Sequence, residues 1–316
     1  MKQSTAALLE TYQVRKSKAQ KQAFIHWVTE HLAAYGYTVR EEAYSKSGSN
    51  LIVGDAASAE ILLTAHYDTQ PNCFFPMYMG FSNWVSFTIS QCLPMLPLAL
   101  IALLVKLLLD ALSAGHLFSP LASMLCIVYC AQFMFGFANR HTANDNTSGV
   151  AALLSILEEL PQEDRRRVCV VFFDQEELGL VGSQKFYKRH KAAVQHKPVI
   201  NFDCVGDGDT LTFVMKKQFR NSAHAGLLQH AAEAALQGSG KSLRFAKALW
   251  NIYMSDQLHF SRGVGVVAAK KAPVFGYYIN NIHSQMDTRL DAENIALLTD
   301  TALRMIRGLD GLPSGR

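Results

Sequence analysis

Short apolar runs recur along the chain, and stretches in which apolar residues have helical spacing separate them. Runs of strand length lie at 61–65, 168–173, 199–202 and 274–279, and shorter strands are expected at 38–42 and 50–53. Helical spacing covers 17–35, 150–160, 184–190, 223–236 and 292–309, and Gly36 is placed to cap the first helix. This alternation predicts an α/β fold with a mostly parallel, mixed sheet sandwiched by helices.

Polar residues that can bind a metal or move a proton follow the four main runs directly. In chain order they are His66 and Asp68, Glu176 and Glu177, Asp203, and His283. A further acidic residue, Asp145, lies just before the helix expected at 150–160. Because sheets of this kind bind ligands at the carboxyl ends of their strands, we expect these side chains to meet there.

Imidazole and carboxylate groups together suit zinc, with cobalt or manganese as substitutes. The five candidate ligands are too many for one tetrahedral catalytic zinc that keeps an open position: His66, Asp145, Glu177, Asp203 and His283. They fit two metal ions that share a bridging carboxylate and lie about 3.5–4 Å apart. Beside Glu177, the carboxylate of Glu176 is placed to act as general base. Asp68, two residues after His66, is placed to accept the other ring N–H and fix its tautomer.

Each element has a simpler explanation when it is taken alone. A His-x-Asp sequence arises by chance, a Glu-Glu pair often begins a solvated helix, and Asn144-Asp145-Asn146 could be a helix N-cap. Asp203 could cap the next turn. The order of the elements, and their shared position at strand ends, favours a metal site over these separate explanations.

In that order, the segments AHYD, ANDNTSGVAALL, FFDQEELGLVGSQKF, NFDCVG and IHSQMDT resemble the co-catalytic dizinc aminopeptidase family. That family also holds glutamate carboxypeptidase-like enzymes and glutaminyl cyclases, and the resemblance covers roughly residues 17–72 and 139–312. It implies the phosphorylase/hydrolase-like zinc exopeptidase fold and two zinc ions. His66 and Asp203 would hold one ion, Glu177 and His283 the other, with Asp145 as the bridge and Glu176 as general base.

The segment 255–260 resembles a family segment that lines the substrate pocket, which assigns Asp256, Gln257 and Phe260 to that pocket. Gln257 stands where the family usually has a histidine. Asp287, four residues after His283, is expected to support the loop that carries this histidine.

The resemblance implies hydrolysis of the N-terminal peptide bond of a peptide substrate. Three other functions stay open: glutaminyl cyclisation, amidase or carboxypeptidase activity, and a catalytically dead binding module anchored to a membrane. Cyclases of the family use a single zinc, so the presence of His66 and Asp203 beside the other three ligands favours the peptidase.

An apolar insertion at 73–138 divides the expected catalytic domain into 1–72 and 139–316. Its only acidic or basic residues are Lys106 and Asp110, with His116 beside them. The uncharged stretches 84–105 and 117–138 would each extend about 33 Å as a helix, against a hydrocarbon core of about 30 Å. They predict a transmembrane hairpin that contacts lipid through 84–138, kinked at Pro94 and Pro97. A re-entrant hairpin, an oligomer interface and a lid over the active site are the alternatives.

The overall composition agrees with this division. Hydrophobic residues make up 49% of the chain, and the charged share of 18% lies below the roughly 25% of typical domains because the insertion has so few charges. The net charge of +4 is scattered, which does not favour nucleic acid. Six cysteines without a disulfide or C-x-x-C spacing indicate free, buried, reduced thiols.

The expected location is a membrane, with the catalytic domain in the cytosol. The N-terminal segment lacks the apolar core of a signal peptide. Arg140 and the basic residues of the N-terminal flank place the catalytic domain on the cytosolic side of an inner or plasma membrane by the positive-inside rule. The oligomeric state is not predicted.

Overall fold

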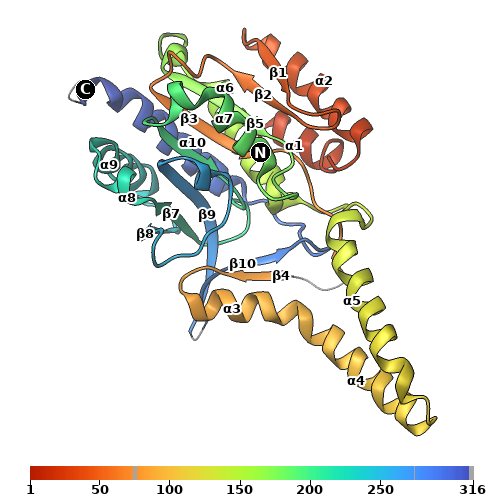
Figure 1. Cartoon of the computed structure of the whole chain (residues 1–316). Helices are drawn as coiled ribbons and strands as arrows, with labels where there is room; N and C mark the ends of the chain where they lie inside the picture. The colour runs from red at the N-terminus through yellow and green to blue at the C-terminus, as the bar shows by residue number, and fades with distance from the viewer. Residues whose placement is uncertain (74–76, 274, 313–316) are drawn as a thin grey trace.

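The structure is a computed structural model that describes residues 1–73, 77–273 and 275–312. A ten-stranded mixed sheet forms its centre, with helices on both faces and a long helical hairpin that projects from one side (Figure 1). This is the α/β architecture that the sequence predicts.

The strands are β1 (Val39–Ala43), β2 (Ser49–Val53), β3 (Ile61–His66), β4 (Met77–Gly80), β5 (Val168–Phe173), β6 (Pro198–Phe202), β7 (Thr210–Met215), β8 (Ser242–Lys247), β9 (Arg262–Ala272) and β10 (Gly276–Ile282). The order along the sheet is β1-β2-β5-β3-β6-β9-β10-β4, and β7 pairs with β8 and β9. Parallel pairing joins β5, β3, β6 and β9 at the centre and also β7 to β8, whereas the other pairs are antiparallel. The three central strands β3, β5 and β6 are buried throughout, which explains their mostly apolar sequences. The buried polar side chains Thr64 and Asn201 within them hydrogen-bond to each other.

The helices of the body are α1 (Gln3–Glu10), α2 (Lys18–Ala34), α6 (Gly149–Glu159), α7 (Val181–Val194), α8 (Lys217–Arg220), α9 (Ala223–Leu236) and α10 (Ala292–Arg307). A capping box between Ser17 and Gln20 begins α2. Gly36 follows its end with a φ of 80°, a left-handed conformation that glycine adopts without steric cost.

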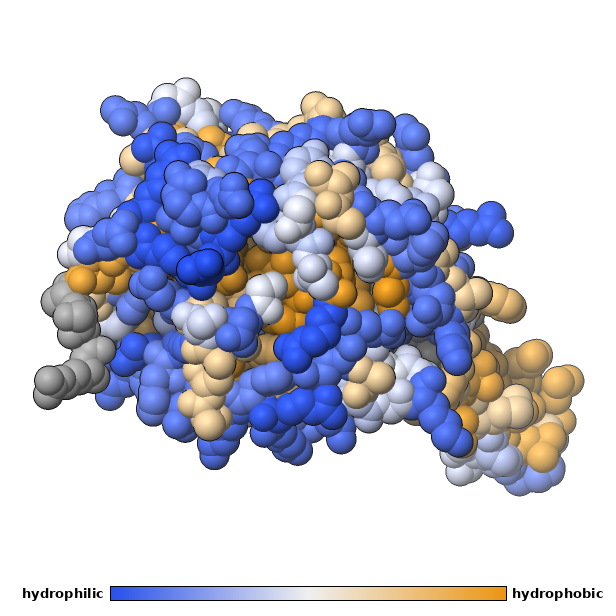
Figure 2. Space-filling model, turned by 90° about the horizontal axis from the view of Figure 1, so that it is seen from above, coloured by the Kyte–Doolittle hydropathy of each residue, from blue (hydrophilic) through white to orange (hydrophobic). Residues whose placement is uncertain are grey.

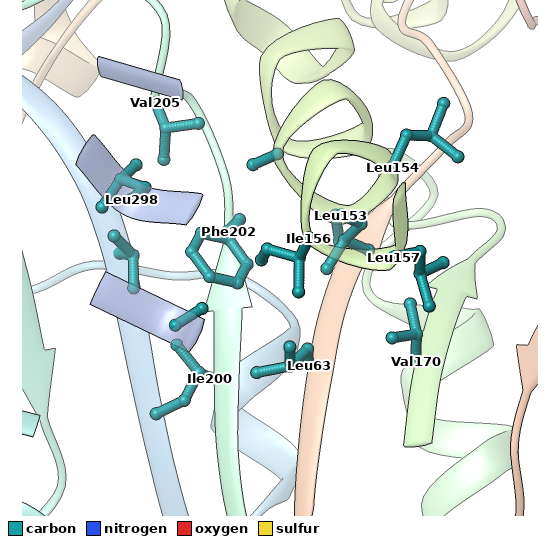
Figure 3. Close-up of a cluster of buried hydrophobic side chains, with 14 of the residues drawn as sticks. Leu63, Leu153, Leu154, Ile156, Leu157, Val170, Ile200, Phe202, Val205 and Leu298 are labelled. Atoms are coloured by element: carbon teal, nitrogen blue, oxygen red, sulfur yellow. The ribbon is translucent and has the colours of Figure 1, made fainter. Parts of the chain in front are cut away.

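Alternate residues of the central strands face two different apolar clusters. Leu63 of β3 and Phe202 of β6 pack beneath Ile156 of α6, with Leu298 of α10 beside them (Figure 3). On the opposite face, Leu62 packs in the cluster that includes residues of α7. The body is therefore a sheet covered on both faces, and this rigid frame fixes the positions of the strand ends.

The projecting hairpin consists of α3 (Trp84–Cys92), α4 (Leu96–Ala111) and α5 (Phe118–Phe135). The stretch expected as one span from Trp84 to Val105 is interrupted by a 3-10 turn at Leu93–Met95, where Pro94 and Pro97 cannot donate backbone hydrogen bonds. α3 packs against β4, which itself joins the sheet edge through β10. α4 and α5 leave the body together (Figure 1).

Apolar side chains cover the outside of this hairpin. By length and composition alone, Trp84–Ala111 and Gly115–Gln132 could each cross a membrane, and only 11% and 6% of their apolar windows are buried. In Figure 2, hydrophobic residues cover much of the visible part of the projection, while most of the other visible surface is hydrophilic. The hairpin is therefore neither a pair of core helices nor a lid folded over the body. Its Cys92, Cys126 and Cys130 are exposed, so the expectation of buried thiols holds only for Cys73, Cys169 and Cys204.

Candidate metal centre

Six side chains from separate parts of the chain converge at the carboxyl ends of the central strands. His66 is the last residue of β3, and Asp203 and His283 directly follow β6 and β10. Glu176 and Glu177 lie in the loop after β5, and Asp145 lies in the turn Ala143–Ser148 that leads into α6. Three groups drawn from these residues each place their possible ligand atoms within 4.8 Å of one another.

The carboxylate of Asp145 lies between two histidines. Its Oδ1 is 3.4 Å from Nε2 of His66, and its Oδ2 is 3.1 Å from Nε2 of His283. Asp203 completes the first side, with Oδ1 at 3.5 Å from the His66 Nε2 atom, and Glu177 completes the second, with Oε2 at 3.5 Å from the His283 Nε2 atom. The five side chains therefore form two sets of three that share Asp145.

These separations fit two zinc sites. Ligand atoms about 2.0–2.1 Å from a tetrahedral zinc ion lie about 3.3 Å from each other, close to the distances between the imidazole nitrogens and carboxylate oxygens. The mixed nitrogen and oxygen donors also match those of catalytic zinc. Each set offers three protein ligands, which leaves room for water or substrate.

Buried hydrogen bonds hold the turn that carries Asp145. The carboxylate of Asp287 accepts from the backbone N–H groups of Asn144 at 2.7 Å and Asp145 at 2.9 Å. The Asn144 side chain accepts from the backbone N–H groups of Gly206 and Asp207, which follow Asp203. Asp287 was expected to support the loop of His283, and its backbone N–H donates to the carbonyl of Ser284 beside that histidine. Its carboxylate in addition fixes the turn of the shared ligand, because that turn presents two free N–H groups.

Asp68 positions the two glutamates. Its carboxylate accepts from the backbone N–H groups of Glu176 at 3.0 Å and Glu177 at 3.3 Å. The nearest acceptor to Nδ1 of His66 is the backbone carbonyl of Asp68 at 3.1 Å, whereas the carboxylate Oδ1 is 3.5 Å away. Asp68 was expected to accept the other ring N–H of His66, and both its backbone carbonyl and its carboxylate lie beside that nitrogen. The carboxylate also accepts the two glutamate N–H groups.

Comparison with known proteins identifies the family. A model of peptidase family M28 matches residues 127–306, which is more than half of the chain. The chain belongs to peptidase family M28. The matched range contains four of the five candidate ligands, and His66 lies before it. Membership makes the chain a metallo-exopeptidase-like hydrolase of a zinc-dependent family. No curated protein matches the sequence.

Solved structures of two kinds of enzyme share the fold. The chain is similar to a glutaminyl cyclase of Porphyromonas gingivalis, with 18% identity, a TM-score of 0.58, and coverage of 96% of this chain and 95% of the other. A glutaminyl cyclase of Macrostomum lignano has 13% identity and a TM-score of 0.61, and the match covers 98% of this chain and 90% of the other. The aminopeptidase LapA of Legionella pneumophila has 14% identity and a TM-score of 0.54, and the match covers 97% of this chain and 70% of the other. At these identities the likeness shows the fold alone.

Without metal, the site holds protons on several of these groups. Burial, reinforced by Asp145, raises the pKa of Glu177 to about 8 although His283 opposes the shift. Burial also opposes charge on His66, but Glu176 and hydrogen bonds to the aspartates outweigh it and hold the His66 pKa well above its usual value. The crowded carboxylates repel one another, and protons reduce this repulsion when no metal is bound. Divalent cations would take the place of these protons and stabilise the site.

Two buried residues of this region were missed by the sequence analysis. Gln70 places its amide between Glu177 and His283, with 2.8 Å from its nitrogen to Glu177 Oε1 and 3.3 Å from its oxygen to the backbone nitrogen of His283. Arg15 is fully buried, donates to the carbonyl of Tyr67, and lies 3.2 Å from Thr147 Oγ1. A glutamine two residues after Asp68 gave a local signal, whereas nothing local singles out Arg15.

The three expected pocket residues are all buried. Phe260 packs in an apolar cluster with Phe173 and Phe186, so it supports the sheet and does not line an open pocket as expected. Gln257 donates to the carbonyl of Tyr253 and accepts from Asn201 of β6. Asp256 is fully buried beneath the site, where burial raises its pKa to about 7 although His66 opposes the shift.

Proposed function

We propose that this chain is a dizinc aminopeptidase that hydrolyses the N-terminal peptide bond of peptide substrates. The observation that carries the proposal is the division of five ligands into two sets that share Asp145. His66 and Asp203 would hold one zinc, and Glu177 and His283 the other. Bound zinc supplies Lewis acidity, which polarises a peptide carbonyl and lowers the pKa of water.

Glu176 is the proposed general base. One of its carboxylate oxygens lies within 4.8 Å of ligand atoms of His66 and Glu177, so it faces the space between the ligand sets. Asp68 holds its backbone nitrogen, which limits the positions that the side chain can reach. The carboxylate would accept a proton from water and return it to the leaving amine.

A glutaminyl cyclase is the alternative on the same fold. A reaction served by one metal at Glu177 and His283 would leave Asp203 and the buried imidazole of His66 without a metal to bind. The five-ligand arrangement therefore favours hydrolysis.

Mass spectrometry of reaction products separates the two activities. Purified protein is incubated with peptides that begin with leucine, alanine, methionine or glutamine, with and without a chelator. The proposal predicts shortened peptides and free amino acids, and loss of both with the chelator. Loss of ammonia from the glutamine peptide without shortening of any peptide would establish cyclisation instead. The Glu176→Gln variant is the control for a contaminating peptidase.

The hairpin is the proposed membrane anchor, contacting lipid through residues 84–138, with the catalytic domain in the cytosol. Its support is the exposure of its apolar side chains, which water would not favour. Deleting 84–135 and joining the ends with a short linker keeps β4 in the sheet. The deleted protein should leave the membrane fraction on alkaline extraction. If it stays with the membranes, the hairpin is not the anchor.

A further inference from the structure

The helix α3 buries two serines and exposes large apolar side chains together with the polar Thr88 and Gln91. Ser86 and Ser90 face the body and are buried, with hydroxyls that donate to the carbonyls of Asn83 and Phe87. On the outside, Trp84 is 65% exposed, Val85 68% and Ile89 44%. A helix on a water-facing surface buries its apolar side. The outer side of α3 is therefore suited to an apolar environment.

A loop of the body continues this apolar surface. Between β8 and the turn at 255–260, Leu249, Trp250 and Met254 are each more than half exposed. Leu249 and Met254 line one surface hollow together with Trp84. The backbone N–H of Ile252 donates to the carbonyl of Phe81, which ties the loop to the start of α3 at 2.8 Å. The outer face of α3 and the loop 248–254 thus form one patch, which we call the basal patch.

In Figure 1, α3 runs along the edge of the body beside β4 and β10 and leads into α4, so the outer face of α3 lies between the loop 248–254 and the projecting helices. The two helices beyond it are long enough to reach across most of a bilayer without α3: at 16 and 18 residues, α4 and α5 extend about 24 and 27 Å against a hydrocarbon core of about 30 Å. α3 is held back against β4 and need not take part in the span.

The chemistry of the patch fits the boundary between lipid headgroups and acyl chains. Tryptophan is enriched at this depth because its ring is apolar and its N–H is polar. Lys247, the last residue of β8 before the loop, is exposed and can meet anionic headgroups. The patch is continuous with the apolar hairpin, so a bilayer that surrounds the hairpin would also cover the patch.

We infer that the basal patch is a second, in-plane contact with the lipid surface, separate from the inserted helices α4 and α5. This inference rests on the proposed membrane anchoring. The patch is connected to His283 through α3, β4 and β10. It is connected to the other ligand set through Tyr253, whose hydroxyl donates to the carbonyl of Asp203 at 2.9 Å. It would hold the metal site at a fixed height above the bilayer and favour peptides presented at the membrane surface.

The chain has three tryptophans, and they allow a direct test of depth: Trp27, Trp84 and Trp250. Variants that keep a single tryptophan, with phenylalanine at the other two positions, are reconstituted as full chains in vesicles of zwitterionic and anionic lipid. The lipids carry bromine either high or low on the acyl chain, and bromine quenches nearby tryptophan. Trp84 and Trp250 should be quenched, and most strongly by the shallow bromine. Trp27, stacked on Tyr12 in the body, is the matched control and should stay unquenched.

Two outcomes would overturn the inference while anchoring stands. Trp250 unquenched in protein that floats with the vesicles would show that the loop is not in lipid. Trp84 quenched most by the deep bromine would make α3 part of the span. Protein that does not float with the vesicles would remove the anchoring proposal itself, and the inference with it.

Activity provides an independent readout. The double variant Leu249→Ser, Trp250→Ser should stay inserted through α4 and α5. It should cleave a lipid-tethered peptide several-fold more slowly than the unmodified protein and a soluble peptide at the same rate. Tyr35→Ser, at an exposed aromatic residue after α2, is the matched control and should change neither rate. Equal effects on tethered and soluble peptides would overturn the proposed role in presenting substrate.

Discussion

Replacing Arg15 with methionine should destabilise the protein and weaken the metal site together. Arg15 lies between α1 and α2 with no exposed surface. Its guanidinium donates to the carbonyls of Tyr67, Tyr12 and Gln13, and its backbone N–H donates to Thr69 Oγ1 at 2.9 Å. Burial lowers the Arg15 pKa to about 10 while Asp68 opposes the shift, so the side chain stays charged at neutral pH. The buried positive charge of Arg15 thus holds two segments next to the ligands, one at Tyr67 and Thr69 beside His66 and the other at Thr147 near Asp145.

The size of the effect follows from what methionine cannot do. It keeps the length of the side chain but has no donor, so several carbonyls lose their partner at a cost of about 1–3 kcal/mol for each that is left buried and unpaired. Removal of one partner from a buried charged arrangement typically costs about 3–5 kcal/mol in total. For a chain of this size we expect the melting temperature to fall by about 6–20 °C. Because Tyr67 lies next to His66, and Thr147 is near Asp145, zinc affinity should fall by about 10–100-fold.

Thermal unfolding and zinc titration of the purified chain measure both effects. Arg15→Lys keeps the charge but not the planar set of donors, and should give an intermediate loss. Arg307→Met, at an exposed arginine in the last turn of α10, is the matched control and should cost less than about 1 kcal/mol. An Arg15→Met protein with the unfolding temperature and zinc affinity of the original chain would refute the reasoning.

Further predictions concern the site and the core. Glu176→Gln should keep both metals and lose about 10²–10⁴-fold in rate, and near-normal turnover would remove Glu176 as the base. His283→Ala should lower the number of bound zinc ions in elemental analysis, and an unchanged number would exclude it as a ligand. Zinc must displace the proton that Glu177, with its pKa of about 8, holds at neutral pH, so zinc affinity should rise as pH increases from 6 to 8. Calorimetry in two buffers should detect released protons, and an affinity independent of pH would contradict the protonated site. Leu153→Ala should cost about 2–5 kcal/mol of stability in denaturant unfolding but leave the rate per folded molecule unchanged, because Leu153 packs in the core (Figure 3).

The central part of the fold could be predicted because buried parallel strands have a local signature. β3, β5 and β6 are mostly apolar runs, and these strands match the expected ones within one residue at each end. The run expected at 274–279 is observed as β10 at Gly276–Ile282, and Val274 lies outside the described residues. β9 was missed because its glycines and alanines lack the bulky side chains that mark a strand, and they are accepted here because the strand is buried. β4 has four residues, and its pairing with β10 depends on contacts across most of the chain.

The ligand cluster was predictable for a similar reason. Each of its residues directly follows a strand or precedes a helix, so local pattern and topology together place it. The contacts of Arg15 join residues 52 and 132 positions apart, and no local pattern reveals them. Phe260 was assigned to the pocket through its motif, but a motif does not give the direction of a side chain.

Anomalous diffraction shows whether Asp145 bridges two zinc ions. Crystals of the detergent-purified chain are measured above and below the zinc absorption edge. We expect two zinc peaks about 3.5–4 Å apart, one beside His66 and Asp203 and the other beside Glu177 and His283, with one Asp145 oxygen on each. A single peak at Glu177 and His283, with the His66 side empty at saturating zinc, would contradict it.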